Sequence, residues 1–517
     1  MAPDRPLFTI AVALAVVAGL VWPAAAPRGA LAPEHVGDAF PAADDGEPDE
    51  HLPATGEPDG LTVVDPGDVV DLTESGLDRE GGVATEVAYP VVPNADPLSD
   101  FLERELSAEV DAFETANPGA VSFESAWNLT AANDDIVGVR VTREETDSEG
   151  TREGYTTYWY DSLTGTTHPS TALVAGQEEL EELNGLVRDA LPEAAAPDAV
   201  HPISSLYDSV GFNPDGDLVV EFDAGQVSPV GEGRTHAVVD ASESGPLLSD
   251  LGERASHAAT RGVRDFAVAD PPEAVEDGRE PTPPGTVSAV DEDVDCSDPD
   301  TKCVALTYDD GPGGRTPELL DMLAEYDARA TFFVTGHPVM EDPRTVRRTY
   351  AEGHELANHT LNHPDLAGLG AGGIRSDLDI VQALVYRETG YTMDLMRPPY
   401  GSTDEEVASV TADLGLAQIL WSIDTNDWKD RKASVVADRA VDGASPGAII
   451  LMHDIHGTTI DASRTIIREL DASGYTMVTV TQLLGTTTPG ETYVDGAPEP
   501  PAPTDGEGGA GTGDETV

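Results

Sequence analysis

The 517-residue sequence has only two cysteines, three lysines and 5% aromatic residues. Basic residues are scarce throughout, with 28 Lys and Arg against 97 Asp and Glu and a formal charge of −69. This balance excludes a protein that binds DNA or RNA by electrostatic attraction. Beyond residue 22 no stretch is apolar enough to span a bilayer, and the lack of a fixed-period repeat argues against a solenoid.

The amino-terminal residues have the features of a secretory signal peptide. Arg5 precedes an apolar run over residues 7–22, and three alanines at 24–26 follow it. We therefore predict a signal peptide over residues 1–26 and an exported protein. The apolar run is shorter than the roughly 20 residues that span a bilayer, which favours cleavage. An uncleaved N-terminal anchor is the alternative.

The two cysteines, Cys296 and Cys303, lie seven positions apart in the segment DCSDPDTKC. In an exported chain such a pair most simply closes a small disulfide loop. A structural zinc site is disfavoured, because two thiolates do not complete one and no histidine lies nearby in the sequence.

Composition divides the chain into linkers and globular parts. Pro, Gly and acidic residues dominate three segments. We predict that residues 27–82 form a disordered acidic linker, 256–295 a second linker and 488–517 a disordered tail. Residues 83–255 combine helix-like apolar spacing with strand-like runs of branched and aromatic residues. This mixture predicts a small α+β domain with an antiparallel sheet.

Residues 296–487 have a different pattern, in which strand-like and helix-like runs alternate. Such alternation predicts parallel strands with right-handed crossovers, in either an open doubly wound α/β sheet or a barrel. The predicted strands are 304–308, 331–334, 355–358, 395–397, 419–423, 448–452 and 477–480. The clearest predicted helices are 317–326, 374–388 and 462–472.

Polar residues cluster at the ends of five of these strands. In parallel β/α architectures the carboxyl ends of the strands build the site, so we expect the clusters to meet. In chain order they are Asp309 with Asp310, His359 with His363, Arg397 with Tyr400, Asp424 with Asp427 and Trp428, and Leu451 with His453.

One acid and two histidines of these clusters fit a metal site. Asp310, His359 and His363 would make a three-ligand zinc site that keeps one position open. A zinc ion there lowers the pKa of water to about 7 and polarises a carbonyl, the chemistry of amide or ester hydrolysis. Co²⁺ and Ni²⁺ also suit this ligand set.

Residues 303 to about 484 resemble the polysaccharide deacetylase domain, the NodB-homology type of carbohydrate esterase family 4. The five clusters match the five motifs of that family in order. The resemblance implies a distorted (β/α)7 barrel whose groove binds N-acetylated or O-acetylated glycans. The cysteine pair before the first strand also resembles the disulfide of actinobacterial members.

The resemblance implies a role for each polar residue. Asp309 would be the general base and Arg397 would pair with it and keep it ionised. His453 would be the general acid that protonates the leaving amine, and Asp427 would raise its pKa and fix its tautomer. For Asp424 a place beside the site and a purely structural role are equally open.

Other residues would shape the substrate pocket. The backbone N–H of Tyr400 would donate to the oxyanion, while Trp428 and Leu451 would line the pocket for the acetyl methyl group. Asp454 and His456 follow the fifth motif, and we expect them to face solvent or the loop.

Two stretches of residues 83–255, at 89–113 and 222–227, resemble the RsiV-like domain that precedes deacetylase domains in some cell-wall enzymes. This resemblance implies an accessory role in binding the wall or a protein. Trp127, Trp159 and Tyr160 could form a sugar platform there, although aromatic residues in strands are more often core.

The sequence therefore predicts a secreted, cell-wall-associated, metal-dependent hydrolase of non-peptide carbon–nitrogen bonds. Its substrate would be peptidoglycan N-acetylglucosamine or N-acetylmuramic acid, with no nucleic-acid partner and no stable protein partner evident. A chitin-oligomer deacetylase, an acetyl-xylan esterase and a non-catalytic glycan-binding wall protein are the alternatives.

Overall fold

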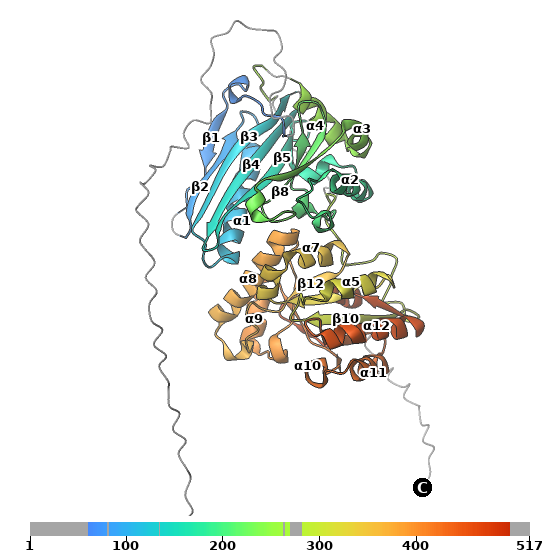
Figure 1. Ribbon diagram of the computed structural model, residues 1–517. Coiled ribbons are helices and arrows are strands. Elements are labelled where there is room, and N and C mark those ends of the chain that lie inside the picture. The colour runs from blue at the N-terminus through green and yellow to red at the C-terminus, as the bar shows by residue number, and fades with distance from the viewer. Residues whose placement is uncertain (1–59, 80–81, 134, 262–263, 269–281, 497–517) are drawn as a thin grey trace, which may run out of the picture. The chain divides into compact units, whose positions relative to one another are not determined.

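The computed structural model describes residues 60–79, 82–133, 135–261, 264–268 and 282–496 (Figure 1). The predicted signal peptide and most of the first linker lie outside these residues. Within them, no helix has the length and apolar character needed to cross a membrane.

The amino-terminal region, residues 60–268, contains a six-stranded sheet in the order β1-β2-β3-β4-β5-β6. All neighbouring pairs are antiparallel except β2 and β3. Helix α1 buries an apolar stripe at three- and four-residue spacing, including Leu98, Leu102 and Leu106. The elements are β1 (Thr73–Gly76), β2 (Ala84–Val91), α1 (Asp96–Ala116), β3 (Ser122–Asn133), β4 (Ile136–Asp147), β5 (Gly150–Asp161) and β6 (Thr166–Pro169).

A second, antiparallel sheet of this region has the order β7-β8-β9. The elements are α2 (Gln177–Ala190), β7 (Ser209–Phe212), β8 (Leu218–Phe222), β9 (Thr235–Val239), α3 (Ala241–Ser244) and α4 (Asp250–Thr260).

Two expectations for this region are wrong. Residues 60–79 were expected to be disordered, yet β1 pairs with β2 and Val64 forms a bridge with Leu129. A few buried apolar side chains anchor this acidic stretch to the sheet. Trp159 and Tyr160 are fully buried, so neither forms a sugar platform.

The carboxyl-terminal region, residues 282–496, alternates strands and helices. Strand β10 is buried along almost its whole length, as expected for a central strand of a parallel sheet. The strands are β10 (Lys302–Asp309), β11 (Thr331–Val334), β12 (Glu355–Asn358), β13 (Leu395–Met396), β14 (Ala417–Ile419), β15 (Ile423–Asp424), β16 (Ile449–His453), β17 (Tyr475–Val478) and β18 (Thr492–Tyr493). The helices are α5 (Thr316–Ala324), α6 (Gly336–Glu341), α7 (Pro343–Ala351), α8 (Ala371–Thr389), α9 (Glu405–Asp413), α10 (Asp427–Asp430), α11 (Ala433–Gly443), α12 (Gly457–Ala472) and α13 (Val480–Leu484).

These nine strands form one parallel sheet in the order β15-β16-β10-β11-β12-β13-β14-β18, with β17 also paired to β10. The sheet is a curled half-barrel; a complete (β/α)7 barrel stays a prediction. The parallel direction brings the carboxyl ends of β10, β12, β13 and β16 to one edge.

The structure differs from the predicted elements at three places. The predicted strand 477–480 lies at 475–478 as β17, and Val480 begins α13. The predicted strand 419–423 is split between β14 and β15, and Trp421, inside the predicted range, is only partly buried. The predicted disordered tail is ordered as far as residue 496, because β18 pairs with β14.

Cys296 and Cys303 form a disulfide, with Cα atoms 5.6 Å apart.

Candidate active site

The polar clusters meet at the carboxyl edge of the parallel sheet. Asp309 ends β10 and His453 ends β16, and the pairing register places these two residues opposite each other. His359 and Arg397 directly follow β12 and β13, while Asp427 lies three residues beyond β15. Five segments that are distant in the sequence therefore deliver polar side chains to one place.

Asp310, His359 and His363 form the one group among the described residues whose side-chain atoms are arranged to hold a metal ion, with ligand atoms within 4.8 Å of one another. Asp310 Oδ1 lies 3.6 Å from Nε2 of His359 and 3.4 Å from Nε2 of His363. Asp310 and His363 have left-handed backbones, with φ of 72° and 53°. Such conformations are costly for residues other than glycine and are frequent at functional sites.

The ring of His359 is held in the orientation that a metal ligand needs. Its Nδ1 donates to the carbonyl oxygen of Arg397 at 2.7 Å, which leaves the Nε2 lone pair facing Asp310. Burial lowers the pKa of His359 to about 3, so the ring is neutral and able to ligate. Asp377 accepts the backbone N–H groups of Leu361 and Asn362 and fixes the turn between the two histidines. The donors present thus fit a divalent cation.

Asp309 is a buried carboxylate held by a buried arginine. Arg397 Nη1 donates to Asp309 Oδ1 at 2.6 Å and to Thr307 Oγ1 at 2.9 Å. Its other nitrogens donate to two backbone carbonyls at 3.0 Å, and its guanidinium lies 4.0 Å from the centre of the Phe333 ring. Burial raises the pKa of Asp309, and Arg397 opposes this only in part. The expected pairing is present, but the net pKa shift is upward, which brings a general base nearer to working pH.

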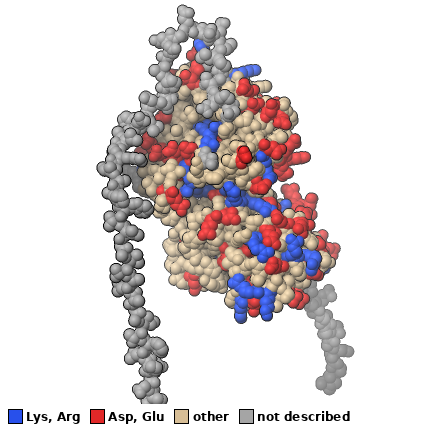
Figure 2. All heavy atoms as spheres, in the orientation of Figure 1, with Lys and Arg blue, Asp and Glu red and all other residues tan. Residues whose placement is uncertain are grey.

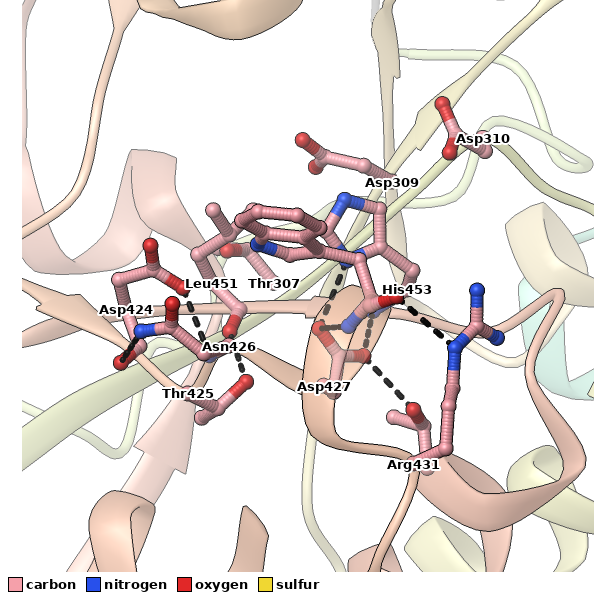
Figure 3. Close-up of polar contacts among 12 residues, drawn as sticks. Thr307, Asp309, Asp310, Asp424, Thr425, Asn426, Asp427, Arg431, Leu451 and His453 are labelled. Carbon is pink, nitrogen blue, oxygen red and sulfur yellow. Dashed lines mark hydrogen bonds and ion pairs between the residues drawn. The ribbon is translucent and has the colours of Figure 1, made fainter.

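His453 is oriented by Asp427, as Figure 3 shows. His453 Nδ1 donates to Asp427 Oδ1 at 2.9 Å, while Asp427 Oδ2 accepts from the His453 backbone N–H at 2.8 Å and from Thr459 Oγ1 at 2.7 Å. Burial alone would lower the pKa of His453, but the hydrogen bond to Asp427 and the charge of Asp309 raise it to about 9. At neutral pH the ring is therefore protonated and can act as a general acid.

Two aromatic side chains lie exposed beside these groups. Tyr400 is 72% exposed, has a left-handed backbone with φ of 61°, and its ring lies 4.7 Å from that of His363. Trp428 is 49% exposed and follows Asp427 directly. Leu451 is buried on β16 two residues before His453, so both side chains lie on the same face of the strand.

Comparison with known proteins places this site in a family. A profile described as polysaccharide deacetylase matches residues 297–419. The peptidoglycan-N-acetylmuramic acid deacetylase PdaA of Bacillus subtilis is 38% identical over 188 residues, which cover 35% of this chain and 72% of that protein. The chain belongs to the polysaccharide deacetylase family.

Two further relatives are informative. The peptidoglycan-N-acetylglucosamine deacetylase PgdA of Listeria monocytogenes is 42% identical over 185 residues, which cover 36% of this chain. This chain spans 39% of the length of that relative. The solved structure of the peptidoglycan deacetylase PdaC from Bacillus subtilis is 40% identical and covers 36% of this chain and 91% of its own, with a TM-score of 0.35. The family assignment rests on the sequence identity.

The structure of this polysaccharide deacetylase family member corrects one expectation for the fifth cluster. Asp454 does not face solvent: it is 1% exposed and accepts a hydrogen bond from Thr316 Oγ1. Its partner comes from a distant segment of the chain, so no local pattern of residues predicts this contact. The neighbouring His456 stacks its ring on that of His453, with centres 5.8 Å apart.

Other residues extend the site or lie at its margin. Thr307 and Thr459 hold Arg397 and Asp427, and no motif of the sequence singled them out. Asp424 is half-buried and accepts the backbone N–H of Asn426 at 2.7 Å (Figure 3). This contact agrees with a structural role.

We expect Gly311→Ala to displace the loop that carries Asp310. A Cβ at Gly311 would lie 2.3 Å from Asp454 Oδ1, and the short, buried Asp454 side chain has no room to move. Overpacking of this kind costs about 1–3 kcal/mol, and misplacement of Asp310 should lower kcat/KM about tenfold or more.

Gly314→Ala is the matched control for Gly311→Ala. It lies three residues away, and a Cβ at that position meets nothing within 4 Å. Thermal denaturation and acetate release should therefore show losses for Gly311→Ala alone. Equal behaviour of the two variants would contradict a positioning role of the Gly311–Asp454 contact.

Proposed function

We propose that this family member is an exported, metal-dependent deacetylase that hydrolyses the N-acetyl groups of peptidoglycan. The observation that carries the proposal is the pairing of Asp309 with Arg397 and of His453 with Asp427 at one strand edge, beside Asp310 and the two histidines. A carboxylate with a raised pKa and a protonated imidazole are the base and the acid that amide hydrolysis requires.

A bound divalent cation, Zn²⁺ with Co²⁺ or Ni²⁺ as alternatives, would be held by Asp310, His359 and His363 and would polarise the acetyl carbonyl and acidify water. Asp309 accepts a proton from the attacking water at Oδ2, because Oδ1 is held by Arg397. His453 gives its Nε2 proton to the leaving nitrogen, because Nδ1 is held by Asp427. Water oxygen joins the acetyl carbon, the C–N bond breaks, and acetate and a free sugar amine leave.

Other residues orient the acetamido group in this proposal. The backbone N–H of Tyr400 donates to the oxyanion, a contribution that reaches about 3 kcal/mol in other hydrolases. Trp428 and Leu451 enclose the acetyl methyl group. The removal of water from this pocket strengthens the hydrogen bonds to the transition state.

The relatives support the choice of glycan. PgdA of Listeria monocytogenes is named for N-acetylglucosamine and PdaA of Bacillus subtilis for N-acetylmuramic acid in peptidoglycan. A chitooligosaccharide deacetylase of Sinorhizobium fredii is 40% identical over 153 residues, so chitin oligomers are the second candidate substrate. Acetylated xylan is a third.

We also propose that the protein is secreted and associated with the cell wall, with an uncleaved N-terminal anchor as the alternative. The disulfide and the signal-like residues 1–26 support export. An RsiV-like accessory domain at 83–255 would bind the wall, and unchanged binding to isolated cell walls after its deletion would contradict that role.

Acetate release tests the proposed function. We expect the purified protein to release acetate from peptidoglycan faster than from chitin oligomers and much faster than from acetylated xylan. A chelator should stop the reaction, and the divalent cation should restore it. A protein that binds these glycans but releases no acetate from any of them would instead be a glycan-binding wall protein.

A further inference from the structure

Two of the three lysines of this acidic chain lie in one turn beside the site. Lys429, Arg431 and Lys432, here called the basic turn, lie in α10 and directly after it, and all three are exposed. Figure 2 shows basic side chains gathered at the lower edge of the molecule, where Figure 1 places α10.

The charges of the basic turn are not neutralised by neighbouring carboxylates. Asp430, the acid within the turn, is already bound to Arg439 at 2.6 Å. Among the residues that the structure describes, no carboxylate lies within 4.0 Å of the three cations. Arg315 and Arg348, by contrast, each contact a carboxylate.

The basic turn is fixed next to the general acid. Helix α10 begins with Asp427, the partner of His453, and Arg431 Nε donates to the carbonyl oxygen of Trp428 at 2.9 Å. Figure 3 shows the Arg431 side chain extending alongside Asp427 and His453. The charge of Arg431 also acts on His456, whose ring stacks on that of His453. The guanidinium of Arg431 therefore lies beside Trp428, which the proposed function assigns to the acetyl pocket.

We propose that the basic turn binds a carboxylate of the glycan and makes the enzyme select anionic peptidoglycan over neutral chitin oligomers. The inference rests on the proposed function. In N-acetylmuramic acid the lactyl ether on O3 neighbours the C2 carbon that bears the acetamido group, so an acetamido group in the pocket brings a carboxylate to the rim. Guanidinium groups bind carboxylates with two parallel hydrogen bonds.

Without such a turn, the charge of the chain would oppose the approach of an anionic glycan. A protein of charge −69 repels an anionic polymer at long range, and only local cations offset that repulsion at the site. Exposed ion pairs contribute about 0.2–1 kcal/mol each and weaken with salt. Three cations should therefore give a preference of roughly 3- to 150-fold that disappears at high ionic strength.

The decisive comparison uses one glycan in two charge states. The substrates are peptide-free (GlcNAc–MurNAc)2, the same tetrasaccharide with its lactyl carboxylates as methyl esters, and (GlcNAc)4. The wild type should favour the free acid over the ester through a lower KM, and 500 mM NaCl should remove the preference. A peptide-bearing tetrasaccharide tells the two carboxylate sources apart, because a preference seen only with it assigns the carboxylate to the stem peptide.

Arg431→Gln and the pair Lys429→Gln with Lys432→Gln should each reduce the preference for the free acid, with kcat on (GlcNAc)4 within twofold of the wild type. Lys302→Gln is the matched control, because it removes one exposed positive charge at the start of β10, the end of the strand opposite Asp309. An unchanged preference in Arg431→Gln, or an equal loss in Lys302→Gln, would overturn the inference.

Calorimetric binding of the same oligomers separates this inference from the proposed function. Tighter binding of the acid than of the ester, with no acetate released from either, would sustain the basic turn and refute the deacetylase. Equal binding and equal acetate release from acid and ester would refute the role of the basic turn and sustain the deacetylase.

Discussion

Asp310→Asn is expected to lower kcat/KM for acetate release roughly 10³-fold, the loss of about 4 kcal/mol of transition-state stabilisation. Asparagine keeps the size of the side chain but replaces a charged ligand oxygen with a neutral amide beside Nε2 of His359 and His363. The remaining imidazoles alone hold a divalent cation poorly. Metal content by elemental analysis and acetate release should therefore fall together, and a chelator should reduce the wild type to the level of the variant.

Asp461→Asn is the control for this prediction. It makes the same chemical change on α12, where Asp461 is exposed and pairs with Arg315 at 3.0 Å. Activity and metal content should stay at the wild-type level. Retention of activity by Asp310→Asn, or its survival in a chelator, would contradict a metal-dependent reaction at this site.

The parallel sheet could be predicted because each of its longer strands has a recognisable local sequence pattern. Runs such as 331–334 and 355–358 are buried on both faces and bounded by helices, and the structure has strands with those bounds. Once strands are parallel, the residues after them must meet at one edge. The proximity of Asp309 and His453 therefore followed from the sequence alone.

The misplaced elements depend on contacts that are distant in the sequence. Residues 419–423 look like one strand, but the carbonyls of Ile419 and Leu420 accept hydrogen bonds from the buried Arg397. The backbone turns to satisfy that guanidinium and the strand is interrupted. Strand β18 is only two residues long, too short for any period to be visible in an acidic tail. The buried position of Asp454 likewise depends on its contacts with Gly311 and Thr316.

Asp427→Asn is expected to move the alkaline limb of the kcat/KM profile to lower pH. His453 acts as an acid only while protonated, and its pKa in the folded protein is raised to about 9. A divalent cation beside Asp310 would lower it, so the wild-type limb lies at or below about pH 9. Removal of the Asp427 charge should lower the pKa of His453 by about 1–3 units. Activity at pH 8 should then fall roughly 2- to 100-fold, and the loss should be smaller near pH 6.

The pairing of His453 with Asp427 also makes the stability of the folded protein depend on pH. The interactions that raise the pKa of His453 stabilise the folded protein. This stabilisation is complete below the pKa of histidine in the unfolded chain, near 6.5, and is lost as the pH rises through about 9. The pKa of Asp427 is lowered: burial would raise it, but the hydrogen bonds from His453 and Thr459 prevail, so its contribution is lost as the pH falls below its ordinary value of 3.8. The melting temperatures of the wild type and Asp427→Asn should therefore differ most near pH 5–6. They should differ less at pH 10, where Asp427 keeps only its hydrogen bonds from Thr459 and the His453 backbone N–H.

Asp424→Asn separates this electrostatic effect from a general disturbance of the loop. It makes the same change three residues earlier, at a carboxylate that accepts from the Asn426 backbone N–H. The alkaline limb of Asp424→Asn should coincide with that of the wild type, because the Asp424 carboxylate does not bond to the His453 imidazole. An unmoved limb in Asp427→Asn, or an equal shift in Asp424→Asn, would mean that another group protonates the leaving amine. If the limb moves in Asp427→Asn alone, proton delivery by His453 depends on the buried carboxylate behind it.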